Sequence, residues 1–169
     1  MKKILIIITV IMAFGLTVSA QTYQVPTNYV LKEKGDYAKY EQEVISTIDW
    51  LEGTPWAVEN QKRDDAKAFF MKWLEGSPTV NIEINKAVGN LCTKNPELFS
   101  SFMGGYTKYA LQNKTAFDKN KANEAGVKAI IHKYISESDH KKNSNVEKLI
   151  KIDKDGKLAD WITTDFYKS

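Results

Sequence analysis

Two histidines are the residues of this sequence whose type most directly suggests metal or general-base chemistry. His132 and His140 are eight residues apart, about 12 Å along the axis of a continuous helix, which is too far to share one metal ion. His132 also falls on the polar side of a helical pattern, so we predict that its side chain is exposed to solvent. No zinc, calcium or phosphate motif accompanies the histidines, and the sequence predicts no cofactor or metal site.

Carboxylate pairs are the second kind of residue that could do chemistry. Glu41 and Glu43 form one pair and Asp64 and Asp65 the other. Adjacent helical residues point about 100° apart, so Asp64 and Asp65 cannot converge unaided, whereas a glycosidase holds two carboxyl groups on opposite sides of a sugar. A solvated helix face is the favoured interpretation. The alternative is a small hydrolase of cell-envelope polymers that uses Asp64 and Glu41.

Cys92 is the only cysteine, which excludes a disulfide within the chain and a zinc site built on paired thiolates. We predict that Cys92 is a small buried hydrophobe rather than a reactive thiol. The segment Asp153-Lys-Asp-Gly156 resembles the middle of an EF-hand loop. Its first and twelfth ligands would be Lys151 and Ile162, which cannot bind calcium, so the segment predicts a turn.

Aromatic side chains and a single arginine point to binding. The chain has four tryptophans, eight tyrosines and seven phenylalanines, more than short amphipathic helices need for a core. Trp50 lies off the apolar stripe of its helix, and either packs against another neighbour or forms an exposed recognition site. We expect Arg63 to be half-buried and to tie its helix to a carboxylate, with Glu59 one turn earlier as a pairing partner. The predicted ligand-binding residues are Trp50, Trp56, Arg63 and Tyr106.

The first twenty residues have the pattern of a secretory signal peptide. Lys2 and Lys3 precede an apolar run over residues 4–16, and Val18-Ser-Ala20 supplies small residues for cleavage. The run is too short for a membrane anchor, and Gln21, the expected mature N-terminus, is not a cysteine that could be lipidated. We expect an exported protein, periplasmic or extracellular, without a membrane anchor in its mature form.

The charge distribution argues against a nucleic-acid partner. The net charge is +3, and removal of Lys2 and Lys3 with the signal peptide would leave +1. The basic residues are 23 lysines and one arginine, and no aromatic residues are interleaved with the lysines.

We expect helices to position the candidate residues named above. We expect an extended N-terminal arm over 21–35 and one compact all-α domain over 36–169, with about five to six short amphipathic helices. Asp36 is the predicted N-cap of the first helix, Asn95 precedes a later one, and Ser144 to Glu147 form a capping box. Residues 79–84 alternate like a short extended piece, and a helix from residue 84 is the alternative. The six predicted helix patterns cover about 36–52, 59–75, 96–110, 122–136, 144–150 and 158–166.

Gly104 and Gly105 lie inside the helix that follows Pro96, where each costs about 1 kcal/mol relative to alanine. We predict that a neighbouring helix approaches closely there; a kink or a ligand groove is the alternative.

The segment Phe102-Met-Gly-Gly-Tyr106 resembles the F-x-x-G-Y segment of small all-helical periplasmic immunity proteins, which neutralise secreted toxins. The resemblance covers these five residues, and the paired cysteines common in that family are missing. It implies an inhibitor or immunity-type role as an alternative. From the residues themselves we expect a non-enzymatic exported domain that binds a small apolar ligand or a protein partner in the cell envelope.

Overall fold

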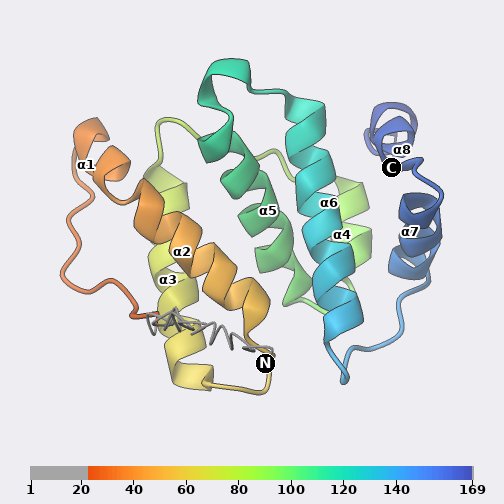
Figure 1. Cartoon of the computed structure of the whole chain (residues 1–169), viewed down its shortest axis with the longest axis horizontal. Coiled ribbons are helices and arrows are strands. Elements are labelled where there is room, and N and C mark those ends of the chain that lie inside the picture. The colour runs from red at the N-terminus through yellow and green to blue at the C-terminus, as the bar shows by residue number, and fades with distance from the viewer. Residues whose placement is uncertain (1–22, 169) are drawn as a thin grey trace, which may run out of the picture.

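The computed structural model describes residues 23–168, and this part of the chain contains eight α-helices, one 3-10 helix and no strand (Figure 1). The all-α prediction is therefore confirmed. The predicted signal peptide, residues 1–20, lies outside the described residues. The helices are α1 (Lys34–Lys39), α2 (Glu41–Gly53), α3 (Asn60–Gly76), α4 (Lys86–Cys92), α5 (Leu98–Gln112), η1 (Lys114–Ala116), α6 (Lys119–Ser136), α7 (Ser144–Lys154) and α8 (Leu158–Thr164).

Helices α5 and α6 form the centre of the molecule. They are joined by the short connection that contains η1 and lie side by side (Figure 1). Helices α2 and α3 pack on one side of this pair, and α4, α7 and α8 pack on the other. No helix in the span 23–168 has the length and apolar character needed to cross a membrane.

Glycines allow α5 and α6 to approach closely. A Cβ atom on Gly105 would lie 2.6 Å from the carbonyl oxygen of Ala125 and 2.8 Å from the Cβ of Ala129. A Cβ on Gly126 would lie 2.7 Å from the ring of Phe102. The predicted close approach of a neighbouring helix is confirmed, and it explains why helix-weakening residues stand inside α5.

The first predicted helix is wrong as a single element, because the chain breaks at Tyr40 between α1 and α2. The carbonyl of Tyr37 accepts from the backbone N–H of Tyr40 at 3.2 Å and from the indole N–H of Trp73 at 2.9 Å. A tertiary bond thus takes a carbonyl that a continuous helix would use. Asp36 is not the N-cap; it is the third helical residue, and its carboxylate accepts from the backbone N–H of Glu33 at 3.1 Å.

Two asparagines at predicted helix starts form hydrogen bonds to distant segments. Asn143, not Ser144, is the N-cap of α7, and its side-chain amide donates to the carbonyl oxygen of Leu91 at 2.9 Å. The side chain of Asn95 bonds both backbone groups of Lys141, each at 2.7 Å. Asn143 thus caps α7 and also bonds a distant helix, whereas the side chain of Asn95 is used by a distant loop.

For residues 79–84 the sequence predicts either a short extended piece or a helix that starts at residue 84. Residues 80–85 form neither a helix nor a strand, and the backbone of Asn85 is extended. Helix α4 begins at Lys86, and the side chain of Asn85 caps it by accepting from the backbone N–H of Val88 at 3.1 Å.

Cys92 is buried in the core, as predicted, and burial raises the pKa of its thiol to about 12. A pKa of about 12 leaves about one thiol in ten thousand ionised at pH 8. We therefore expect the Cys92 thiol of the folded protein to react with an aromatic disulfide reagent at least a hundred times more slowly than the same thiol in urea-unfolded protein, with both rates measured at the same pH. Absorbance of the released thiolate measures both rates, and equal rates would contradict the burial.

Candidate binding groove

The structure brings together three of the four residues predicted to bind a ligand. Trp50, Trp56 and Arg63 lie around the connection between α2 and α3, and the guanidinium carbon of Arg63 is 5.9 Å from the ring centroid of Trp50. Tyr106 lies elsewhere, in the core, with only 2% of its surface exposed. Its ring packs against Phe102 and offers no exposed face to a ligand. The segment from Phe102 to Tyr106, which resembles the immunity proteins, is therefore part of the packed contact between α5 and α6.

A groove of about 710 Å³ lies beside Trp50, between the N-terminal arm and α2. Its volume falls within the range of about 300–1,000 Å³ that is usual for ligand sites. The residues from α2 are spaced by three and four positions, so they share one face of the helix. The groove is lined by Tyr23, Gln24 and Pro26 from the arm and by Gln42, Glu43, Ser46, Asp49 and Trp50 from α2.

Two stacked aromatic rings form the wall of the groove. The rings of Tyr23 and Trp50 have their centroids 5.0 Å apart and are inclined by 24°. The ammonium group of Lys62 lies 4.9 Å from the centroid of the Trp50 ring. The hydroxyl of Tyr23 donates to Oγ1 of the buried Thr47 at 2.9 Å, and burial raises the pKa of this tyrosine. The arm is therefore fixed against α2 by both stacking and a hydrogen bond.

Acidic groups line the α2 side of the groove. The carboxylate of Asp49 pairs with the ammonium group of Lys108 at 2.5 Å. The carboxylate of Glu43 forms no ion pair within residues 23–168. The groove therefore presents one uncompensated negative charge beside its aromatic wall.

Arg63 is buried, with 5% of its surface exposed, and its partners are backbone carbonyl groups rather than the predicted carboxylate. Its guanidinium donates to the carbonyl oxygens of Thr54, of Pro55 at 2.9 Å and of Leu51 at 3.4 Å. The expected pair with Glu59 does not form, because Glu59 pairs with Lys62 at 3.1 Å. The guanidinium group of Arg63 is planar and its N–H groups point in different directions, so one side chain can donate to several backbone carbonyl groups.

A buried ion pair on α6 holds the same connection. The ammonium group of Lys133, 2% exposed, lies 2.6 Å from a carboxylate oxygen of Glu137, 6% exposed. Lys133 also donates to the carbonyl oxygens of Glu52 at 3.1 Å and Thr54 at 2.7 Å, and Glu137 accepts from the backbone N–H of Trp56 at 3.1 Å. Burial raises the pKa of the Glu52 carboxyl group beside this pair. We call Arg63, Lys133 and Glu137 the loop clamp.

The sequence analysis missed Lys133 and Glu137. The signal was present, because position 133 is three residues after Ile130 and position 137 is three residues after Tyr134, on the apolar stripe of α6. A charged residue at a core position of a helix marks a buried pair when a second one follows four residues later.

The carboxylates of the alternative hydrolase do not line the groove at Trp50. Asp64 has 72% of its side chain exposed and lies 4.0 Å from the ammonium group of Lys67. Glu41 pairs with Lys114 at the other end of α2. The contact of Asp64 lies within α3, where Lys67 pairs more closely with Glu97 at 2.5 Å, and the contact of Glu41 joins α2 to η1, so the two acids lie on different elements.

The histidines lie apart from the groove. His132 is exposed, as predicted, and His140 packs its ring on Tyr134 with a centroid separation of 3.8 Å. Nδ1 of His140 lies 2.6 Å from the carbonyl oxygen of Glu137. Among residues 23–168, no group of three or more histidine, cysteine and acidic side chains is arranged to hold a metal ion.

Stacked rings, amides and a carboxylate are groups that recognise a ligand, and the loop clamp fixes the corner beside them. No protein-family model matches this chain, and neither a curated protein nor a solved structure matches it.

Proposed function

We propose that the protein is an exported, non-enzymatic domain that binds an extended segment of a partner protein in the cell envelope. The observation that carries this proposal is the groove beside Trp50, with the stacked Tyr23 ring as its wall. Export is proposed from the pattern of residues 1–20, which have a basic start, an apolar run and a small-residue cleavage site.

The N-terminal arm supports a polypeptide as the occupant. Residues 23–27 have no regular secondary structure, Asn28 bends the chain with a φ of 56°, and residues 24–29 form no backbone–backbone hydrogen bond within the described chain. The backbone groups before this bend have no partner in the described chain, and apart from Pro26, which has no N–H, they can pair with an added strand, a common way to bind a peptide. The polar groups of Gln24, Gln42 and Glu43 along the groove suit a peptide with basic and apolar side chains better than a purely apolar molecule.

The loop clamp supports the same function by fixing the corner in advance. Because buried side chains hold the connection between α2 and α3, little conformational entropy is lost there when a partner binds. A preorganised corner raises affinity without any added contact.

Site-specific photo-crosslinking in the host cell tests the proposal. A benzoylphenylalanine in place of Ser46, which is exposed in the groove, is expected to give one discrete protein adduct. The same group in place of Asp155, in the turn between α7 and α8, is expected to give none. Trp50→Ala is expected to reduce the Ser46 adduct at least tenfold, since aromatic anchors supply much of the binding energy of an interface.

The crosslinking variants need a folding control, which the circular dichroism spectrum of each purified variant provides. A fully folded Trp50→Ala variant that gives the adduct at the original yield would show that the groove does not bind the partner. The absence of any adduct at Ser46, or equal adducts at Ser46 and Asp155, would also contradict the proposal.

A further inference from the structure

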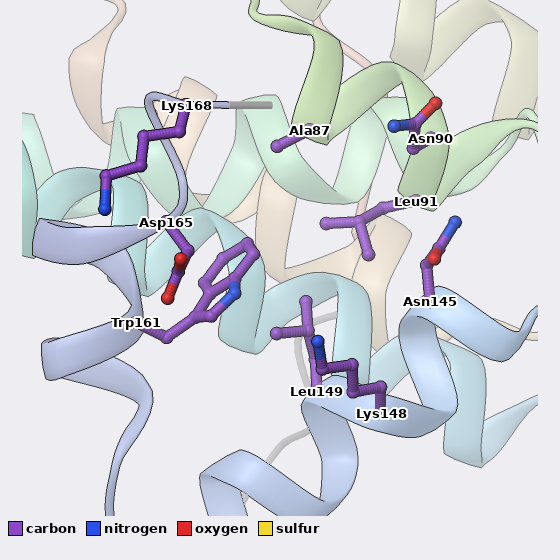
Figure 2. A pocket seen from close by; sticks show the side chains of 9 residues that line it. All are labelled: Ala87, Asn90, Leu91, Asn145, Lys148, Leu149, Trp161, Asp165 and Lys168. Carbon is purple, nitrogen blue, oxygen red and sulfur yellow. The ribbon is translucent and has the colours of Figure 1, made fainter.

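A second pocket lies between α4, α7 and α8 (Figure 2). These three helices lie on the opposite side of the α5–α6 pair from α2 (Figure 1). Its volume is about 320 Å³. Leu91 and Leu149 are both buried and form its apolar floor with Ala87, and the ring of Trp161 stands at one wall (Figure 2). Helix α4 and the consecutive helices α7 and α8, with the residues that follow α8, thus create one recess with a buried apolar floor.

Polar groups without partners surround this apolar floor. The side-chain amides of Asn90 and Asn145 and the ammonium groups of Lys148 and Lys168 form no hydrogen bond or ion pair within residues 23–168. The indole N–H of Trp161 also has no acceptor in this part of the chain. In Figure 2 the Lys148 ammonium group is directed toward Trp161, and the indole nitrogen is on the side of the ring that faces Leu149.

The acidic residue of the pocket is set apart from these donors. Asp165 lies across the Trp161 ring from the two leucines (Figure 2), and its carboxylate accepts from the hydroxyl of Thr164 at 2.9 Å. The charged lining residues, Lys148, Lys168 and Asp165, sum to +1. The interior between Trp161 and Leu149 therefore offers hydrogen-bond donors over an apolar floor.

We infer that this pocket binds a small organic anion, with a carboxylate that accepts from Lys148 and the Trp161 indole and an apolar body that packs on Leu91 and Leu149. Charge-assisted hydrogen bonds favour an ionised carboxylate over a neutral hydroxyl at the same place. The recess is large enough for a short acyl chain or one ring. The inference does not depend on the proposed peptide groove, because the two sites share no residue.

Nuclear magnetic resonance of the indole N–H groups tests this site with octanoate as the probe. The sequence has four tryptophans, and Trp161→Phe identifies the signal of Trp161. Octanoate is expected to shift the Trp161 indole signal in a saturable way and to leave those of Trp50, Trp56 and Trp73 in place. Octanol and octyltrimethylammonium, which have the same chain and no negative charge, are expected to bind at least tenfold more weakly.

A pair of lysine variants separates the specific contact from general charge. Lys148→Gln is expected to weaken octanoate binding about tenfold. Lys121→Gln removes an exposed lysine of α6 that does not line the pocket, and it is expected to leave the affinity unchanged. Both lysines are exposed, so both variants should fold.

Three outcomes would overturn the inference. One is the absence of a saturable shift of the Trp161 indole signal with octanoate. Another is binding of octanol as tightly as octanoate, which would make the recess an apolar pocket without selection for an anion. The third is an equal loss of affinity in Lys148→Gln and Lys121→Gln.

Discussion

Replacing Lys133 by methionine is expected to lower the free energy of unfolding by about 3–5 kcal/mol. Methionine fills a similar volume, so the loss comes from charge rather than from a cavity. Without the ammonium group, the carboxylate of Glu137 remains buried without its counter-ion, and the carbonyl oxygens of Glu52 and Thr54 lose a donor. Urea denaturation followed by circular dichroism measures the change.

The matched control is Lys128→Met on the same helix. Lys128 also pairs with a glutamate four residues away, Glu124 at 2.7 Å, but its side chain is 53% exposed. Solvent screens such a pair, and the expected loss is below about 1 kcal/mol. Similar losses in the two variants would show that the Lys133–Glu137 pair contributes no more than a surface ion pair.

Gly105→Ala is expected to destabilise the protein by about 1–3 kcal/mol, although alanine favours a helix more than glycine does. The added methyl group would lie 2.6 Å from a backbone carbonyl oxygen of Ala125, which cannot move without a shift of α6. Thermal and urea unfolding of the variant measure the loss.

Gly89→Ala provides the control with the opposite sign. Gly89 is also helical, but a Cβ atom there meets nothing within 4 Å. The variant is expected to gain about 0.5–1 kcal/mol from helix propensity alone. If Gly105→Ala were stabilised to the same extent, the close contact between α5 and α6 would be contradicted.

The helix class of the chain is predictable because its apolar residues repeat at three and four positions, and the structure buries the same stripes. In α6, for example, Val127, Ile130 and Ile131 are predicted on one face and are buried. The helix ends were less predictable. Tyr40 ends α1 where the indole of the distant Trp73 takes a backbone carbonyl, and a local sequence pattern does not contain that contact. At α7 the sequence offered two neighbouring capping residues, and Asn143 rather than Ser144 is the cap.

The candidate groove was predictable only in part. Trp50 could be singled out because it stands off the stripe of its helix, and Arg63 because it is the only arginine. Tyr106 was selected by its aromatic type alone, and the α5–α6 contact buries it. Lys133 and Glu137 were passed over because charged residues are ordinarily exposed. The pocket at Trp161 depends on which helices meet, which periodicity does not specify.

The loop clamp also affects the order in which parts of the chain can fold during synthesis. The ammonium group of Lys133 and the carbonyl of Glu52 that it bonds are 81 positions apart. During synthesis, α2, α3 and their connection therefore exist well before the side chain that fixes them. Because contacts between distant residues form late, the corner beside Trp50 is completed only when α6 docks. We therefore expect the connection between α2 and α3, next to the candidate groove, to be fixed only after α6 has been made and folded.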